Sequence, residues 1–344
     1  QHGYVKDRGS MIGMILCGGL GKRLRSVSAQ TPKGLLEIQP KYTILDRQIF
    51  QYKSAGIDRV LLLTAHLGNR IEKRFGKSHM GVRLDYVQEK KPMGTLNAIR
   101  LGMRKAKEDV IVSNGDIICD INLKRMCNKW RKSRTWGSMF IVRMRSPYGI
   151  VRIKGRKITG FQEKPLLDYY INGGFYCLSQ RVLPILERYK TGDIEKTAFP
   201  EMAKKGNLTY YREEGIYWAS IDSPKDLEAV REEYSNRKDK PWGYEKLLKL
   251  DRKRMEKLLY IMAGYRTSMH YHRKRDEILK VVQGSGEVVY EDGKRKLLKT
   301  GVKIHIKPGE VHSFVAKTNL LLHERSTPHP NDAVRVKDFY DFRV

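Results

Sequence analysis

The sequence has no long apolar runs and is poor in cysteine and in amide side chains. Its longest apolar runs, such as residues 60–65 and 110–113, are far shorter than the roughly 20 residues that cross a bilayer, which excludes a membrane-spanning helix. Only four cysteines occur, none of them in a C-x-x-C pair, and residues 237–344 contain none. This pattern predicts a cytoplasmic protein without structural disulfides. Asn and Gln total only 19, whereas Lys, Arg and Glu are abundant, as in many heat-adapted proteins.

Acidic residues are too few to balance the basic ones. The chain has 68 Lys and Arg against 38 Asp and Glu, a net charge of +30 that divides into about +19 on residues 1–236 and +11 on residues 237–344. A field of this sign attracts polyanions, either nucleic acid or nucleotide phosphates. The interleaved aromatic residues and reader motifs typical of nucleic-acid-binding proteins are absent from the sequence. We therefore expect small phosphorylated partners, and neither nucleic acid nor a membrane.

Length and composition are those of a folded protein of about two domains. Of the 344 residues, 40% are hydrophobic and 31% are charged, so an ordinary core can form. Residues 1–10 end in Gly-Ser and lack the apolar stretch of a signal peptide, and we expect them to be a cloning remnant. Residues 11–236 and 237–344 differ in pattern and are predicted to be separate domains.

Residues 11–236 alternate short β-branched runs with amphipathic helices, such as an expected helix at 44–54 followed by an expected strand at 58–64. This alternation predicts an α/β domain whose mixed, mainly parallel sheet is covered on both faces. A polar, proline-broken stretch at 237–242 is typical of a connection. Beyond it, short alternating strands at a spacing of roughly eight to twelve residues predict an all-β barrel or sandwich.

The first expected strand leads into the glycine turn LCGGLGKRL (residues 16–24), and TPKGLLEI (residues 31–38) follows. Glycines at such a turn let backbone N–H groups approach phosphates closely. The turn is not a P-loop, because no Gly-Lys-Ser/Thr closes it, and it lacks the full Gly-x-Gly-x-x-Gly dinucleotide pattern. Arg23 and Lys33 add two cations that can neutralise a triphosphate.

These segments resemble the signature of the sugar-1-phosphate nucleotidyltransferases, which implies a Rossmann-like fold. In that family a sugar phosphate oxygen attacks the α-phosphorus of a nucleoside triphosphate in line and expels pyrophosphate, a reaction that depends on positioned cations. Further segments match the family in order between residues 11 and 233: EKKPMGT (89–95), NGD (114–116), YGIV (148–151), FQEKP (161–165) and INGGFY (171–176).

The resemblance implies which residues are catalytic. Arg23 would hold the β- and γ-phosphates, and Lys33 would lie at the α-phosphate, where charge develops. Asp116 would bind Mg²⁺, a hard cation that prefers oxygen ligands. The family usually completes this metal site with Trp-x-Asp-Ile-Gly-Thr-Pro, but here Ser220 stands at the place of that aspartate. Because two residues along a strand preserve the face, Asp222 is predicted to be the second Mg²⁺ ligand.

The same resemblance implies the substrate-binding residues. Glu89 lies where the family reads the base, and a carboxylate there can pair with N1–H and N2–H₂ of guanine, which favours GTP. The nucleotide is expected to contact Leu16, Gly18, Gly19, Gly21, Glu89, Pro92, Gly94 and Thr95. The sugar phosphate is expected to contact Gly149, Glu163, Lys164, Asn172 and Gly173.

Histidines at ligand spacing mark the second domain. His270 and His272 lie two apart, so they share a strand face, while Glu277 and His312 follow from later strands. Three histidines and a carboxylate suit a divalent transition metal: Zn, Fe, Mn or Ni. These residues resemble the two motifs of the cupin barrel, a jelly roll, although Lys307 replaces the usual proline.

The segments KPWGYE (240–245) and DAVRVKDFY (332–340) resemble the opening and closing motifs of type II mannose-6-phosphate isomerases. In that family the isomerase module follows a mannose-1-phosphate guanylyltransferase module on one chain. The terminal Tyr-Gly-Arg expected there is Tyr340-Asp341-Phe342 here. Isomerase activity and a catalytically silent, dimerising cupin that binds metal therefore both stay open.

Taken together, the sequence predicts a cytoplasmic, homodimeric or larger enzyme that joins a nucleoside triphosphate and a sugar 1-phosphate in the presence of Mg²⁺. GTP and mannose 1-phosphate, giving GDP-mannose or a GDP-heptose relative, are the expected substrates. One alternative is a CTP- or UTP-using transferase with a structural or regulatory cupin. Another is a chain whose only active domain is the cupin, the transferase being degenerate at Ser220.

Overall fold

The computed structural model describes residues 11–19, 31–65, 67–89, 91 and 93–342. Their contacts divide them into two compact units, each built from separate stretches of the chain. The first unit takes the residues up to 36 together with 57–77 and 83–222; the second takes 37–56, 78–82 and the residues from 223 onward. The second unit thus includes residues that precede the predicted boundary at 236.

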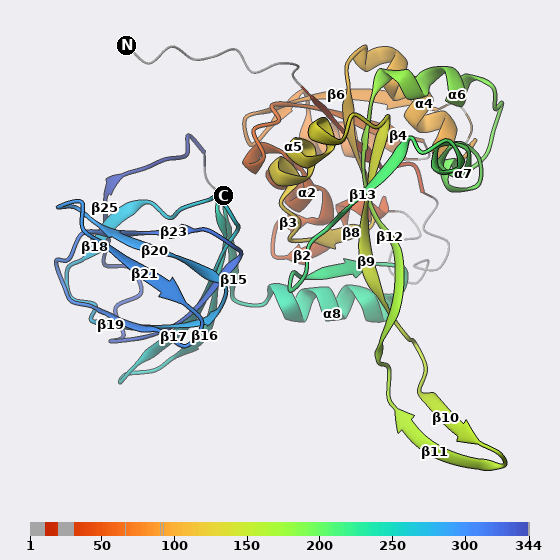
Figure 1. Ribbon diagram of the computed structural model, residues 1–344. Helices are drawn as coiled ribbons and strands as arrows, with labels where there is room; N and C mark the ends of the chain where they lie inside the picture. The colour runs from red at the N-terminus through yellow and green to blue at the C-terminus, as the bar shows by residue number, and fades with distance from the viewer. Residues whose placement is uncertain (1–10, 20–30, 66, 90, 92, 343–344) are drawn as a thin grey trace. The chain divides into compact units, whose positions relative to one another are not determined.

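A mixed sheet forms the centre of the first unit. Its strands are β1 (Ile12–Leu16), β4 (Arg59–Thr64), β6 (Val82–Gln88), β7 (Val110–Asn114), β9 (Gly137–Arg145), β12 (Leu166–Leu178) and β13 (Leu208–Arg212). They lie in the order β13-β9-β12-β7-β1-β4-β6 (Figure 1). Strands β4 and β7 run parallel to β1, and β12 runs antiparallel to both β7 and β9. The predicted mixed, mainly parallel sheet is confirmed.

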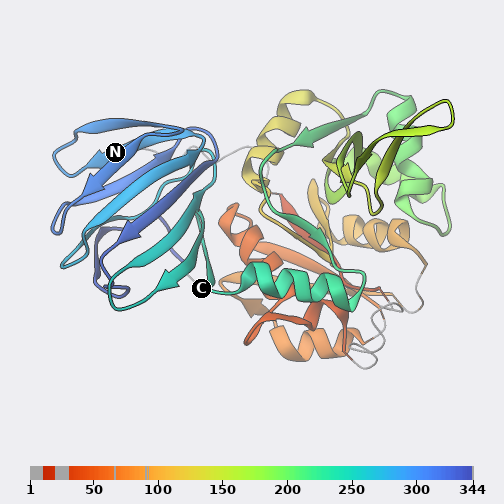
Figure 2. The ribbon, with the colours of Figure 1, turned by 90° about the horizontal axis from the view of Figure 1, so that it is seen from below.

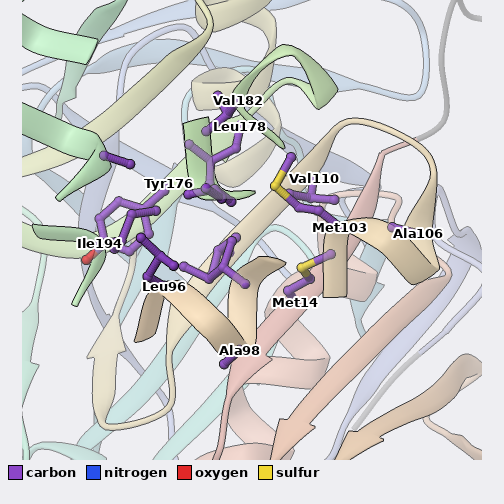
Figure 3. Close-up of a cluster of buried hydrophobic side chains, with 14 of the residues drawn as sticks. Met14, Leu96, Ala98, Met103, Ala106, Val110, Tyr176, Leu178, Val182 and Ile194 are labelled. Carbon is purple, nitrogen blue, oxygen red and sulfur yellow. The ribbon is translucent and has the colours of Figure 1, made fainter. Parts of the chain in front are cut away.

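Helices cover both faces of this sheet. They are α3 (Gly68–Phe75), α4 (Thr95–Ala106), α5 (Leu123–Ser133), α6 (Leu183–Glu187) and α7 (Ala198–Lys204). Tyr176 of β12 is buried in a cluster with Met14, Leu96 and Met103 (Figure 3). Its neighbour Cys177 points the other way, with its Sγ 3.9 Å from Cys127 Sγ of α5.

Two short strand pairs extend from the first unit. Strands β8 (Ile117–Cys119) and β14 (Trp218–Ser220) pair antiparallel. Strands β10 (Ile150–Lys154) and β11 (Lys157–Gln162) form a hairpin that projects from β9 and β12 as an arm (Figure 1). Every residue of β10 is exposed. The arm therefore presents its side chains to solvent in the described structure.

The second unit contains a barrel of two antiparallel sheets, whose strands run in two layers (Figure 2). Trp242, Ile261, Phe314 and Leu322 belong to its core. The prediction of an all-β second domain is confirmed. The strands are β15 (Arg237–Lys240), β16 (Gly243–Leu250), β17 (Met255–Ile261), β18 (Met269–His272), β19 (Glu277–Gln283), β20 (Ser285–Tyr290), β21 (Arg295–Lys299), β22 (Lys303–Ile306), β23 (His312–Ala316), β24 (Leu320–Ser326) and β25 (Ala333–Lys337).

The same unit includes elements from the first half of the chain. They are β2 (Glu37–Gln39), β3 (Tyr42–Thr43), α2 (Ile44–Ser54), β5 (Ser78–His79) and, later in the chain, α8 (Pro224–Tyr234). Both α2 and α8 begin with a capping box, formed in α8 by Ser223 and Asp226. The C-terminal Phe342 packs its ring edge-on against Phe50 of α2, with centroids 5.6 Å apart.

The stretch 237–242, polar and broken by a proline in the sequence, lies within the fold of the second unit. Its first four residues form β15, and Arg237 is almost fully buried. The guanidinium group of Arg237 lies over the rings of Tyr234 and Tyr244 and pairs with Asp239 at 3.0 Å. Because the rings and the carboxylate together replace water, a charged residue is stable at this buried position.

The sequence predicts neither a membrane-spanning helix nor a disulfide, and the described residues bear on both predictions. No helix among them is long and apolar enough to cross a membrane. All four cysteines are free thiols, of which three are buried. Burial raises the pKa of the Cys17 thiol well above its usual range, so this residue at the end of β1 is protonated at neutral pH.

Candidate functional site

Asp116 follows β7 at the carboxyl edge of the sheet. The turn before it approaches β1 so closely that Gly115 N donates a 3.1 Å hydrogen bond to Leu16 O. A Cβ atom at Gly115 would lie 2.2 Å from that oxygen, so glycine is required there. The turn thus fixes the Asp116 carboxylate beside the end of β1, where Leu16 opens the predicted phosphate loop.

Asp222 reaches the same place from a distant part of the sequence. Strand β14 pairs with β8 so that Ser220 lies opposite Ile117, and Ile221 N donates a 2.9 Å hydrogen bond to Asp116 O. The hydroxyl of Ser220 donates to Asp222 Oδ2 at 2.7 Å. Ser220 therefore orients the carboxylate that lies two residues beyond it, a contact that the sequence pattern did not indicate.

Lys33 joins the two carboxylates. It opens the 3₁₀ helix Lys33–Leu35 after Pro32, and its Nζ lies 2.9 Å from Asp116 Oδ2 and 3.4 Å from Asp222 Oδ1. The Lys33 side chain is only 15% exposed, less than expected for a residue in an open cleft, because the two carboxylates enclose it. Three predicted catalytic residues from three distant motifs are thus brought together.

The described part of the glycine turn supports a close approach of backbone to a ligand. Gly18 lies against Ala65, to whose Cβ an added side-chain carbon would come within 3.1 Å. Among the described residues, none lies within 4 Å of the Cβ position of Gly19. The remaining predicted contacts of this kind, Gly21, Arg23 and Pro92, lie outside the described residues.

The predicted base-reading segment is fixed by hydrogen bonds to its surroundings. Glu89 N donates to Thr64 O at 2.9 Å, and one Glu89 carboxylate oxygen accepts from the Asn97 amide. Gly94 has a φ of +92° and lies against the backbone of Gly192, where a Cβ would be 2.2 Å from the Gly192 oxygen. Glu89 and Gly94, on either side of this segment, are therefore both fixed by contacts with the surrounding backbone and side chains.

Glu195 connects the predicted nucleotide and sugar segments, and sequence reasoning missed it. Its carboxylate accepts from Thr95 Oγ1 at 3.0 Å and from Tyr176 Oη at 3.4 Å. Tyr176 Oη in turn accepts from Asn172 Nδ2 at 2.7 Å. No motif in the sequence marks Glu195, because its partners come from two other segments of the chain.

The predicted sugar-binding residues fall into two places. Asn172 Oδ1 accepts from Gly174 N at 2.8 Å, and Gly173 lies so close to the Phe140 ring that a Cβ would come within 2.4 Å. Glu163 and Lys164 instead lie just beyond β11, with side chains 64% and 54% exposed and 3.8 Å apart.

Gly149 precedes β10 at the base of the arm. A Cβ there would lie 2.4 Å from Phe161 Cζ, at the far end of an exposed side chain, so glycine lets the Phe161 ring lie directly against the backbone. Glu163 Oε2 would lie 3.0 Å from the same Cβ, so Gly149 and Glu163 are neighbours at the base of the arm.

In the barrel, each of the three predicted histidine ligands is held through Nδ1. His270 Nδ1 is 2.9 Å from Ser268 O, His272 Nδ1 is 3.0 Å from Asp332 Oδ1, and His312 Nδ1 is 2.9 Å from Glu310 O. The backbone oxygens beside His270 and His312 accept a hydrogen bond from Nδ1–H, which leaves Nε2 of these two rings as the atom with a lone pair. His272 instead lies between two carboxylates, Asp332 at Nδ1 and Glu277 at Nε2. The His312 Nε2 atom is buried without a hydrogen-bond partner.

Glu277 lies among these histidines. Its carboxylate is 3.1 Å from His272 Nε2 and 3.8 Å from His312 Nε2, and it also accepts from Arg275 Nη1 at 3.2 Å. Burial alone would raise its pKa, but the His272 hydrogen bond and the surrounding positive charge hold the pKa near 2. Burial, together with His312, lowers the pKa of His270 to about 4. The ionised Glu277 carboxylate thus lies near a neutral His270 imidazole.

The imidazole and carboxylate donors are the types that a transition metal prefers, but their present positions do not form a metal site. Within the described part of the chain, no group of three or more His, Cys, Asp or Glu side chains could hold a metal ion as it stands. At Glu277, His272 and Arg275 both contact the same carboxylate oxygen, Oε1. The orphaned His312 Nε2 and the anchored Nδ1 atoms nevertheless fit a divalent ion of the Zn or Fe type.

A cavity of about 510 Å³ surrounds this cluster inside the second unit. Besides the four predicted ligands it is lined by cations, of which Arg275 is buried and also binds Glu324 at 3.5 Å. Burial and the nearby Glu277 raise the pKa of Glu324. The basic lining residues are Arg237, Lys238, Lys240, Lys257, Arg275 and Arg335. Such a lining favours an anionic ligand.

Comparisons with known proteins agree with both halves of this description. Residues 12–237 match the family model described as nucleotidyl transferase, and residues 258–322 match the model described as cupin domain. The chain is 30% identical over 246 residues to mannose-1-phosphate guanyltransferase beta-B of Xenopus laevis, which covers 66% of this chain and 68% of that protein. Both resemblances inferred from the motifs are confirmed.

A second relative and a solved structure extend the comparison. Over 228 residues the chain is 31% identical to mannose-1-phosphate guanylyltransferase catalytic subunit beta of Xenopus tropicalis, covering 63% of this chain and 62% of that protein. The chain thus spans somewhat under two thirds of that relative. The structure of HddC from Yersinia pseudotuberculosis superposes with a TM-score of 0.52 at 24% identity, over 65% of this chain and 99% of that one. This last likeness shows the fold alone.

Proposed function

Because the chain belongs to the nucleotidyl transferase family, we propose that it transfers a nucleotidyl group from GTP to mannose 1-phosphate, with release of pyrophosphate and formation of GDP-mannose. The observation on which this rests is the meeting of Lys33, Asp116 and Asp222 at the carboxyl edge of the sheet. The names of the relatives at 30% and 31% identity favour the same substrates.

Phosphoryl-type transfer depends on charge and position more than on covalent chemistry. Asp116 and Asp222 would hold Mg²⁺, which supplies Lewis-acid stabilisation of the phosphate oxygens, and two hard carboxylates on paired strands fit that ion. Lys33 would stabilise the charge that develops on the α-phosphate, and Arg23 would hold the departing pyrophosphate. Ser220 would keep the Asp222 carboxylate in position.

GTP is proposed because Glu89 offers a carboxylate that can accept from two neighbouring N–H groups of guanine. The Asn97 amide already binds one of its oxygens, which would fix the plane of the carboxylate against the base. CTP or UTP is the alternative, because the fold by itself selects no base. The remaining nucleotide contacts are proposed at the glycine turn and at Gly94 and Thr95.

Mannose 1-phosphate is proposed to lie beside Asn172 and Gly173. Glu195 fixes this region, because it accepts from Thr95 on the nucleotide side and from Tyr176 on the sugar side. Glu163 and Lys164, exposed beyond the arm strand β11, would have to approach the sugar phosphate from the hairpin base. Closure of this hairpin over the substrate would also exclude water from the reacting phosphates.

For the barrel we propose a divalent transition metal bound by His270, His272, Glu277 and His312. Two roles remain open for it: isomerisation of a sugar phosphate, which the cationic cavity would suit, and a structural or regulatory role. The sequence departs from the isomerase motif at Asp341 and Phe342. The Phe342 ring packs on Phe50, and this contact favours a structural role for the C-terminal segment.

One matrix of assays tests these proposals together. Each of the five common nucleoside triphosphates is combined with glucose, mannose and other hexose 1-phosphates, and pyrophosphate release is measured with Mg²⁺. We expect the fastest release with GTP and mannose 1-phosphate. Release only with CTP or UTP would select the alternative base, and no release with any pair would contradict nucleotidyl transfer. A cytoplasmic location and a homodimeric or larger assembly stay predictions.

A further inference from the structure

Lys33 lies where the proposed function requires a divalent cation. Its ammonium group is 2.9 Å from Asp116 Oδ2 and 3.4 Å from Asp222 Oδ1, so it binds one oxygen of each carboxylate. These oxygens are the hard donors that Mg²⁺ needs. An ammonium group and a metal ion cannot share them at full strength, because both are cations competing for the same negative charge.

The protein backbone gives the carboxylates little freedom to move apart. The β8–β14 pairing and the hydrogen bond from Ile221 N to Asp116 O hold the two segments side by side. Ser220 fixes the second oxygen of Asp222 at 2.7 Å. Two like charges held together in this way need a neutralising cation, and Lys33, with its side chain 15% exposed, supplies it.

We propose that Lys33 is an exchangeable internal cation. It neutralises Asp116 and Asp222 until nucleotide phosphates offer its ammonium group another anion, and only then do the carboxylates accept Mg²⁺. The inference rests on the proposed function for the identity of the metal and of the displacing ligand. The long, flexible lysine stem makes such an exchange feasible, whereas a buried bidentate arginine would not move as readily. It follows that metal alone binds weakly and enters with the nucleotide.

Binding of Mn²⁺ alone to the full chain, followed by the electron paramagnetic resonance signal of free Mn²⁺, tests this exchange without any turnover. Lys33→Met removes the charge and keeps the length of the side chain, and we expect it to bind Mn²⁺ at least about tenfold more tightly than the wild type. Lys33→Arg keeps the competing charge and should bind as weakly as the wild type. Mn²⁺ held by the barrel is subtracted with the double variant Lys33→Met/Asp116→Asn.

Thermal unfolding gives a second readout. Mg²⁺ should raise the melting temperature of Lys33→Met, where it relieves the repulsion between the carboxylates, and should leave that of Lys33→Met/Asp116→Asn unchanged. A folded Lys33→Met that binds Mn²⁺ no more tightly than the wild type overturns the proposal. So does tight binding of Mn²⁺ by the wild type itself that Asp116→Asn abolishes, a result that requires no Lys33 variant to fold.

The failure of this inference can be told apart from that of the proposed function. If Lys33→Met gains Mn²⁺ affinity but no triphosphate yields pyrophosphate with the wild type, the internal cation stands and nucleotidyl transfer is wrong. If GTP and mannose 1-phosphate react but Lys33→Met gains nothing, transfer stands and Lys33 does not compete with the metal.

Discussion

The Lys33 ammonium group and the Glu277 carboxylate each bind two polar side chains, yet their surroundings differ. Around Lys33 the partners are open to solvent, with Asp116 32% and Asp222 50% exposed. Around Glu277 the partners His272 and Arg275 are both 4% exposed, and Asp332 holds His272 from behind. Charges in the open site can change partners at low cost, whereas charges in the closed site are fixed by burial.

The charged groups around Lys33 are accessible to a ligand, whereas the groups around Glu277 are already held in place by the fold. In the first unit, the predicted catalytic residues lie on loops and at strand ends, where Lys33 pairs with Asp116 and Asp222. In the barrel, outer oxygens fix every imidazole before any ligand arrives. Substitutions should therefore affect the two sites independently and to different extents.

Loss of either carboxylate beside Lys33 should have the largest effect. Asp116→Asn and Asp222→Asn are each expected to lower Mg²⁺-dependent transfer by at least about 10³-fold, because an amide binds a hard dication poorly. Pyrophosphate release at saturating GTP and mannose 1-phosphate measures this. The metal content of the barrel should stay at the wild-type value. Normal activity in Asp222→Asn would show that the second ligand lies elsewhere.

Removal of a phosphate-binding cation should be next in size. Arg23→Ala and Lys33→Ala are each expected to reduce turnover by at least about 10²-fold, the scale of one preorganised charge contact. Lys73, exposed on α3, offers a matched control: Lys73→Ala should leave turnover unchanged. If either Arg23→Ala or Lys33→Ala kept more than about half of the wild-type rate, its phosphate assignment would be wrong.

In the barrel, the outer partner of His272 offers a milder perturbation. Asp332→Asn is expected to weaken transition-metal affinity by about 10- to 100-fold, because His272 loses the carboxylate that holds its Nδ1 proton. Competition with a chelator, read by elemental analysis, measures the affinity. Asp292→Asn, in an exposed turn, serves as the control. A change in nucleotidyl transfer in the same variant would contradict the independence of the two sites.

Ser220→Ala should have the smallest effect. Although the Ser220 hydroxyl donates to Asp222 Oδ2, Asp222 is half exposed, so water can take the place of the hydroxyl. We expect transfer to fall by less than about tenfold, mainly through a higher Mg²⁺ requirement. A loss as large as that of Asp222→Asn would mean that Ser220, at the place of the family's aspartate, is itself essential.

The sequence predicts local features best where one motif determines both structure and chemistry. Gly115 and Asp116 stand next to each other in the chain, so a strand end and a metal ligand were predicted together. Asp222 followed from the two-residue period of a strand, although the paired strand β8 was unknown. Glu195 and the burial of Arg237 were not predictable, because their partners are brought together only by tertiary packing.

The burial of Arg237 also bears on how the two halves of this chain can evolve. Asp239 pairs with Arg237 and with Arg47 of α2 at 3.2 Å, and Tyr42 donates to it at 3.0 Å. Leaving one member of such a buried set without its partner costs about 3–5 kcal/mol. A chain cut after residue 236 would take Asp239 away from Arg47, and a barrel made alone would lack Arg47 and Tyr42. Separation of the two halves at this boundary would therefore destabilise each of them, which opposes the loss of either half by itself.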